Sequence, residues 1–189
     1  MANVDAPNGL KPVRHISGGV VRANEWKIAS GLSTAIFTGD CVKLLGTGYI
    51  DECDAGDRIL GVFAGCKYTK SSGEPIFSRQ WTASLATQGS VDVTAYVYDD
   101  PNIVFAVQSA GSADFADIGN LADIVATAGD TSTGQSNHEV SGTTGTGTAG
   151  LRILGLYNEP KNAYGTNGVL ETVIWEHELS GHDQSTAGV

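Results

Sequence analysis

Apolar and polar residues alternate along most of this chain with the period of a β-strand. In residues 91–98 (VDVTAYVY) every second position is valine or alanine, and the positions between are aspartate, threonine or tyrosine. A period of two is typical of a strand with one buried face. Similar runs end at glycine, aspartate or proline about every 8 to 12 residues, the spacing of an all-β sandwich or barrel. We therefore predict an all-β fold of one or two small antiparallel β-barrel or β-sandwich modules.

One segment departs from this pattern. Residues 111–129 place large apolar side chains at the spacing of a helix, with aspartates in positions that can cap it. Gly119 weakens the helix, and the stretch LADIVAT (121–127) also fits a strand. The pattern therefore predicts at most one short helix, with a strand over 121–127 as the alternative.

Residues 1–27 have no sustained periodicity and are predicted to form an extended N-terminal arm. They contain two of the five prolines and four of the eleven Lys and Arg residues. Such a segment is either a loosely ordered terminus or an arm that orders on a partner. PVRHI (12–16) and GVVRANEW (19–26) each have the composition of a strand that adds to a neighbour's sheet edge. We expect the folded body to survive removal of residues 2–24.

The rest of the chain divides into two β modules, predicted at 28–110 and 111–189, that share a core. The second contains a long Gly/Ser/Thr-rich loop at 129–150. The string RILG occurs at 58–61 and again at 152–155. Either the two modules are related or good strand residues have been reused by chance. In related modules, each glycine would lie where a strand bends or another backbone approaches closely.

Composition and charge limit the classes of partner. The chain has 189 residues and a formal net charge of −10, and so acidic a chain lacks the basic face that nucleic acid requires. It has no apolar run long enough for a membrane span and no apolar signal-peptide core, so we expect neither membrane insertion nor export. Cys41, Cys53 and Cys66 lack metal-site spacing, and we expect three reduced, buried thiols without zinc.

Three motifs resemble catalytic or binding signatures, but their contexts do not fit. GTGTAG (145–150) matches the dinucleotide fingerprint in its letters, yet it precedes a strand instead of opening a helix. HELSGH (177–182) does not give its histidines the H-E-x-x-H spacing of a zinc-binding helix. STGQSNHE (132–139) has a serine near a histidine, but a glycine-rich loop is poor at holding a catalytic triad. We therefore predict no enzyme activity, no cofactor and no metal.

Three stretches of the chain carry a resemblance to a known family. They are MANVDAPNGLKPVRHISGG at the start, GDCVKLLGTGYIDECDAGDRILGVFAG in the centre and LRILGLYNEPKNAYGTNGVLETVIWEHEL near the end. These stretches resemble the head-decoration, or cement, proteins of tailed bacteriophages, and together they cover about half of the chain. The resemblance implies a β-rich protein that lies on the outside of an icosahedral shell.

Function, partners and location follow from this resemblance as expectations. It implies a non-enzymatic virion structural protein, made in the host cytoplasm, that binds the major capsid protein on the outer capsid surface and stabilises the shell, typically as a homotrimer. We predict capsid contacts by four residues of the N-terminal arm, Lys11, Arg14, Arg22 and Trp26. Two alternatives stay open: another virion component, such as a tail, fibre or minor head protein, and a carbohydrate-binding β module that uses the three tryptophans.

Overall fold

The computed structural model describes residues 3–145 and 149–179 and shows an all-β chain. The helical elements of these residues are two single 3-10 turns, η1 (Gln88–Ser90) and η2 (Phe115–Asp117). No helix in the described ranges has the length and apolar character needed to cross a membrane. Every ladder between named strands is antiparallel. The predicted antiparallel all-β fold is confirmed.

Two larger sheets hold most of the strands. The first has the order β2-β9-β6-β4-β5, with β7 paired to β6. Its strands are β2 (Asn24–Ile28), β4 (Cys41–Leu44), β5 (Ile50–Glu52), β6 (Gly61–Thr69), β7 (Pro75–Ser78) and β9 (Val93–Tyr98). The second has the order β1-β10-β16-β14-β12-β13. Its strands are β1 (Lys11–His15), β10 (Ile103–Gln108), β12 (Leu121–Val125), β13 (Glu139–Gly145), β14 (Leu151–Leu156) and β16 (Val169–Ile174).

Two short ladders accompany these sheets. One joins β3 (Ile36–Phe37) to β8 (Gln80–Trp81), and the other joins β11 (Ser112–Ala113) to β15 (Gly165–Thr166). Neither large sheet closes on itself among the residues of the two described ranges. Of the two predicted architectures, the sandwich therefore fits better than the barrel.

The two large sheets repeat one topology. We call residues 24–98 the first module, and residues 11–15 together with 103–174 the second module. In chain order, the repeated strands are β2, β4, β5, β6 and β9 in the first module and β10, β12, β13, β14 and β16 in the second. In each sheet the corresponding strands lie in the same order. Each module also has one short ladder, β3–β8 or β11–β15, and its two strands come at the same points in the chain order. The fold is therefore duplicated, and the first module is inserted between β1 and β10.

The register of the strand pairs repeats as well. In both β6 and β14 a bulge precedes a glycine that pairs with the last strand of the module, Gly65 with Tyr96 and Gly155 with Glu171. Tyr96 and Glu171 are therefore equivalent positions. The two RILG strings are not equivalent, because the glycine of the first string is Gly61, at the start of β6, whereas Gly155 corresponds to Gly65.

Two clusters of buried side chains fill the molecule, and the first module contributes to both. One cluster surrounds Phe63 and Trp81 inside the first module. The other surrounds Phe105 and Leu151 in the second module. This second cluster also contains four side chains of the first module: Cys41, Cys53, Ile59 and Val62. The region around β4 and β6 is thus buried on both faces, and the two modules share a core.

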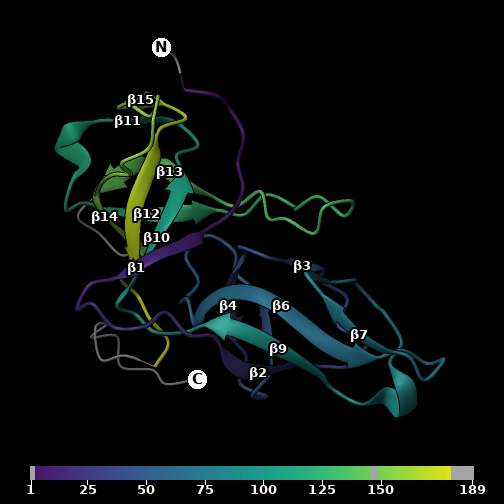
Figure 1. The fold of residues 1–189 in the computed structure, drawn as a ribbon. Coiled ribbons are helices and arrows are strands. Elements are labelled where there is room, and N and C mark those ends of the chain that lie inside the picture. The colour runs from purple at the N-terminus through teal and green to yellow at the C-terminus, as the bar shows by residue number, and fades with distance from the viewer. Residues whose placement is uncertain (1–2, 146–148, 180–189) are drawn as a thin grey trace.

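The N-terminal segment lies on the second module instead of projecting as an arm. β1 pairs with β10, so the predicted strand PVRHI completes a sheet of its own chain. Leu10 is only 1% exposed, and its N–H donates to Gly39 O at 2.9 Å in the first module. In Figure 1, β1 runs along the boundary between the two modules. Removing residues 2–24 would delete a strand and a core leucine, so the structure argues against a body that survives this deletion.

Other boundaries also differ from those expected from the sequence. β10 precedes residue 110 but belongs to the second module, because its partners are β1 and β16. Residues 111–129 contain the short strand β11, the single turn η2 and then β12, which is the alternative strand. Within the predicted loop 129–150, Ser136 and His138 are fully buried and β13 pairs with β12, while residues 146–148 lie outside the described residues.

Candidate functional site

The four residues predicted to touch a partner lie on two different sheets. Lys11 and Arg14 belong to β1 of the second module, where Arg14 Nη2 lies 2.6 Å from Glu171 Oε2. Trp26 belongs to β2 of the first module. Arg22 is exposed in the connection that leads into β2. The structure thus brings Arg22 and Trp26 to one sheet edge and places Lys11 and Arg14 on another.

β2 is the terminal strand of its sheet, and no strand of the described residues hydrogen-bonds to its outer edge, although β5, the other terminal strand, lies close to part of β2. Arg22, Asn24 and Glu25 are exposed along this edge. An edge strand presents unpaired N–H and C=O groups, which makes it a template for another strand. The equivalent edge of the second module, on β10, is covered by β1. The two modules therefore differ at this edge although they share one topology.

Charged and apolar side chains lie on the first module from β2 across β9 and β6 to β7. Glu25 and Lys27 alternate along β2, and Lys67 Nζ on β6 lies 3.2 Å from Glu25 Oε1. Phe77 and Val91 are 78% and 65% exposed, and with Lys67 they line a cavity of about 280 Å³. We call this set the β2 surface: Arg22, Glu25, Lys27, Lys67, Phe77 and Val91.

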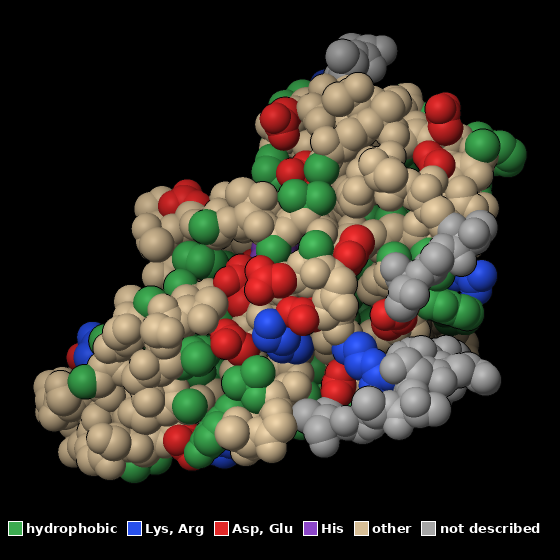
Figure 2. Space-filling model, turned by 180° about the vertical axis from the view of Figure 1, so that it is seen from behind, with side chains coloured by type: hydrophobic (Ala, Val, Ile, Leu, Met, Phe, Trp, Pro, Cys, Tyr) green, Lys and Arg blue, Asp and Glu red, His purple; other side chains and the backbone are tan. Residues whose placement is uncertain are grey.

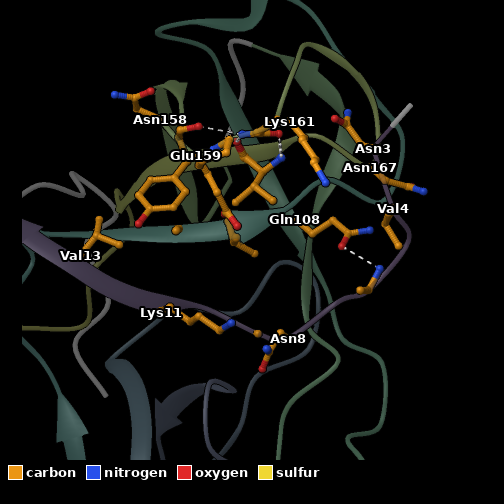
Figure 3. Close-up of a pocket in the computed structure, with 18 residues that line it drawn as sticks. Asn3, Val4, Asn8, Lys11, Val13, Gln108, Asn158, Glu159, Lys161 and Asn167 are labelled. Carbon is orange, nitrogen blue, oxygen red and sulfur yellow. Dashed lines mark hydrogen bonds between the residues drawn. The ribbon is translucent and has the colours of Figure 1, made fainter. Parts of the chain in front are cut away.

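A larger groove of about 800 Å³ follows β1 on the second module (Figure 3). Its amide side chains already hold the N-terminal segment. Gln108 Oε1 accepts a hydrogen bond from the Ala6 N–H at 3.0 Å. The Asn3 side chain bonds to the backbone of residues 163–166. The N-terminal segment therefore forms one wall of this groove, opposite residues of β10 and of the 157–169 stretch.

A buried polar cluster joins the two modules, and no sequence motif predicted it. Asp40 and Glu52 come from the first module, whereas His138 precedes β13 in the second. His138 Nε2 lies 3.0 Å from Glu52 Oε1 and 3.4 Å from Asp40 Oδ1. Burial raises the pKa of Asp40 to about 6, although the facing His138 pulls this pKa down. The three residues are far apart in the sequence, so only the folded chain reveals the cluster.

The cluster has the composition of a metal site, and its ligand atoms lie within 4.8 Å of one another. The hydrogen bonding of His138 argues against that use. The Cys41 N–H donates to His138 Nδ1 at 3.3 Å, so the neutral ring carries its proton on Nε2, which faces both carboxylates. A metal would need the lone pair of that nitrogen. We interpret the cluster as a hydrogen-bonded clasp between the modules.

The motifs that resembled catalytic signatures have structural partners here. His177 is 2% exposed and its Nε2 lies 2.8 Å from Asp99 O, while burial lowers the pKa of His177. Its motif partner, His182, lies outside the described residues, as do three positions of GTGTAG. Ser136 Oγ accepts a hydrogen bond from the His138 N–H at 2.9 Å, which caps a turn. These contacts are structural.

The three tryptophans contact three different partners. Trp26 Nε1–H donates to Asp99 Oδ2 at 2.9 Å. Trp81 is fully buried in the core of the first module. The Arg152 guanidinium lies 4.0 Å from the ring centre of Trp175. Their roles in packing and hydrogen bonding weaken the case for a shared sugar platform.

The three cysteines are buried and free. Burial raises the pKa of the Cys66 thiol to about 12, and it also raises the pKa of Cys41 and of Cys53. The thiolate is the nucleophile and the metal ligand. At neutral pH these side chains therefore act as small apolar core residues.

Comparisons of the chain with protein-family models, with characterised proteins and with solved structures give no match. The surface itself is acidic: Asp and Glu side chains gather near the middle of the face in Figure 2, beside a few Lys and Arg side chains. This agrees with the formal net charge of −10. The β2 surface, with three cations among its six residues, stands out against that background.

Proposed function

We propose that this protein is a non-enzymatic structural component of a bacteriophage virion, which binds the major capsid protein on the outer surface of the icosahedral shell and stabilises it. One observation carries the proposal: the β2 edge is open, whereas β1 covers the equivalent edge of the second module. An open edge on an otherwise completed fold is a suitable place for a partner strand. The resemblance of three sequence stretches to head-decoration proteins supports the same role.

The construction of the body suits a stabilising protein. The shared core and the clasp hold the two modules together, so a partner bound to the first module also fixes the second. A protein that binds only the assembled shell stabilises that shell by mass action. The homotrimer implied by the resemblance would add avidity, because each further contact acts at a high effective concentration.

Charge would orient the protein on the shell. Arg22, Lys27 and Lys67 form a basic island on a chain whose net charge is −10. An acidic capsid surface would repel most of the molecule and attract this island, which favours docking through the first module. Arg22 was predicted as a contact from the sequence, and in this proposal it keeps that role.

Electron microscopy of the particles tests the proposal. Purified protein is added to shells of the phage that encodes the chain, after removal of the bound copies, and the complexes are imaged. We expect density for the two-module body on the outer shell at high copy number. Density confined to a tail or fibre, at tens of copies or fewer, would assign the chain to the alternative virion role.

Salt and one charge reversal sharpen this test. Binding should weaken as ionic strength rises, since exposed charges are screened within about 8 Å at physiological salt. Arg22→Glu should reduce shell occupancy, because it reverses a charge beside the open edge. Lys161→Glu makes the same change in charge at an exposed position of the second module and should leave occupancy unchanged. Equal losses for both variants would show that net charge alone, without the β2 surface, controls binding.

A further inference from the structure

We propose that the β2 surface accepts an extended segment of the capsid protein as an additional antiparallel strand, with an acidic side chain facing Lys27 and a basic side chain facing Glu25. The identity of the partner rests on the proposed function. The mode of pairing rests on the duplicated fold, in which the second module already shows this edge occupied. The covered edge therefore serves as an internal template for the open one.

The repeated register fixes which residues correspond. Tyr96 and Glu171 are equivalent, and each lies opposite a residue of the first repeated strand: Glu25 opposite Tyr96, and Ala106 opposite Glu171. Glu25 therefore corresponds to Ala106. Two positions further along the same face, Lys27 of β2 corresponds to Gln108 of β10.

The two faces differ in exposure in the way that a missing strand predicts. Ala106 and Gln108 are each 5% exposed, because residues 3–15 lie over them. Their counterparts Glu25 and Lys27 are exposed. The topology is the same, and the N-terminal segment accounts for the difference. A comparable segment on the first module would cover Glu25 and Lys27.

The substitutions between the modules indicate the charges of that segment. On the second module, Lys11 lies opposite Ala106, and Gln108 Nε2 donates to Asp5 Oδ1 at 3.1 Å. On the first module, a base in the place of Lys11 would face Glu25. An acid in the place of Asp5 would face Lys27. In the template each charged side chain faces an uncharged one, Lys11 facing Ala106 and Asp5 contacting Gln108. On the first module both contacts would become pairs of opposite charge. This favours an occupant that carries an acid and then a base in the same order as residues 5–11.

Apolar groups extend the surface beyond the edge. Phe77 lies opposite Lys67 in the β6–β7 ladder, and with Val91 it lines the cavity of about 280 Å³. Lys67 and Thr94 line this cavity too, and Thr94 lies opposite Lys27. A strand added beside β2 would be separated from β7 by β2, β9 and β6, so its side chains would not reach Phe77, and the pairing rests on Glu25 and Lys27.

A synthetic peptide tests the pairing without any capsid. The probe is residues 3–16 of this chain (NVDAPNGLKPVRHI), added to the full-length, isotope-labelled protein and followed by backbone amide NMR. We expect saturable shifts over residues 22–27. Lys27→Glu should weaken peptide binding on the order of tenfold, since it turns an attraction into a repulsion. A peptide with Asp5→Lys should restore binding to the Lys27→Glu protein.

Several results would overturn the pairing. Shifts confined to residues 103–108 would show that the peptide only exchanges with the chain's own β1. Failure of the charge swap to restore binding would refute the assigned register. Self-association of the protein that Lys27→Glu abolishes would assign the surface to a second copy instead of a capsid segment. Arg79→Glu is the matched control, because Arg79 is exposed and lines neither the groove beside β1 nor the cavity at Phe77, and it should bind the peptide as the wild type does.

Shell binding then separates this inference from the function on which it rests. If the wild type coats shells and Lys27→Glu coats them equally well, decoration stands and the strand pairing is refuted. If the wild type does not coat shells, decoration is refuted, and shifts at residues 22–27 would still establish the edge as a strand acceptor. Ala23→Pro, which removes one N–H near the edge, provides a second variant for the same comparison.

Discussion

At the scale of single residues, the clasp brings three ionisable groups into a buried space. Asp40 is fully buried, and its Oδ2 accepts the Phe37 N–H at 2.6 Å. Burial disfavours the charged carboxylate, and this raises the pKa of Asp40 from 3.8 to about 6. The shift links the stability of the module junction to pH.

Asp40→Asn isolates this link, because an amide oxygen can still accept the Phe37 N–H but does not titrate. The folded-state pKa of Asp40 is above its unfolded value, so its favourable contribution is full below pH 3.8 and is lost as the pH rises through about 6. Urea unfolding from pH 3.5 to 7, a range set by the pKa values of about 4 and 6, should show the variant gaining roughly 3 kcal/mol relative to the wild type. A difference that does not change with pH would contradict the assignment.

Asp57→Asn provides a control with the opposite sign. Burial alone would raise the pKa of Asp57, but hydrogen bonds from Lys43 Nζ at 2.6 Å and from the Asp54 N–H at 2.8 Å hold it below its ordinary value. Its contribution is therefore present at neutral pH and is lost as the pH falls through the folded-state pKa. The deficit of this variant should be largest near pH 7 and shrink in acid.

At the scale of elements, the N-terminal segment behaves as part of the fold. Gly9 has φ +63°, and a Cβ there would lie 2.5 Å from Ser136 Cβ and 2.7 Å from Gly39 O. The segment passes between these two groups only because the side chain is absent. This close passage is what allows Leu10 to reach the core and β1 to reach β10.

Gly9→Ala should therefore destabilise the protein by more than about 2 kcal/mol, through the clash and the left-handed backbone together. Gly18→Ala is the matched control: its φ is +75°, but no atom lies within 4 Å of the added Cβ. It should lose only the backbone term of about 1 kcal/mol. Chemical denaturation measures both, and equal losses would show that the passage beside Ser136 is not tight.

Local sequence patterns predicted the strands better than their partners. Alternation in residues 91–98 and the stretch LADIVAT identified β9 and β12, because a period of two is a local property. The pairing of β1 with β10 joins residues far apart in the chain, and no local pattern encodes it. The expectation that a glycine of RILG marks a close approach of another backbone holds for Gly61, where an added Cβ would clash with Tyr98 O. The prolines and glycines of residues 1–27 favoured the prediction of an extended arm. In the structure, contacts of this segment with both modules fix it to the folded body.

At the scale of the whole molecule, the shared core makes the two modules one cooperative unit. Ile59 of the first module packs in the core of the second, and its N–H donates to Glu176 O at 3.0 Å. Neither module can unfold without exposing part of the other's interior. Independent domains would instead show separate transitions.

We expect one unfolding transition, seen at the same urea concentration by two reporters. Variants that retain only Trp81 or only Trp175 report on the first and the second module, and their fluorescence midpoints should coincide. Ile59→Ala should lower both midpoints together, with a loss of about 2 to 5 kcal/mol for a buried isoleucine. Two resolved transitions, or a shift in only one reporter, would show that the modules fold separately.

The candidate site was only partly accessible from the sequence. The basic residues of a segment without periodicity indicated Arg22, which is exposed beside β2. Trp26 was predicted with it, but its side chain is half-buried against the core of the first module. The β2 surface also contains Lys27, Glu25 and Phe77, which only strand pairing brings together. That the edge of β2 lacks a partner strand becomes clear only when the two modules are compared. The clasp depends on three residues brought together by the fold, so no spacing rule could have found it.

The insertion of the first module between β1 and β10 also has a consequence for the order of synthesis. The ribosome releases β1 before either sheet exists, and β10 follows only after the whole first module. At roughly 5 to 20 residues per second, β1 then stays without its partner for several seconds. During that interval the first module can fold with its β2 edge open and β1 tethered beside it. The second module is therefore completed last, when β1, which is synthesised first, pairs with β10, which is synthesised only after the first module.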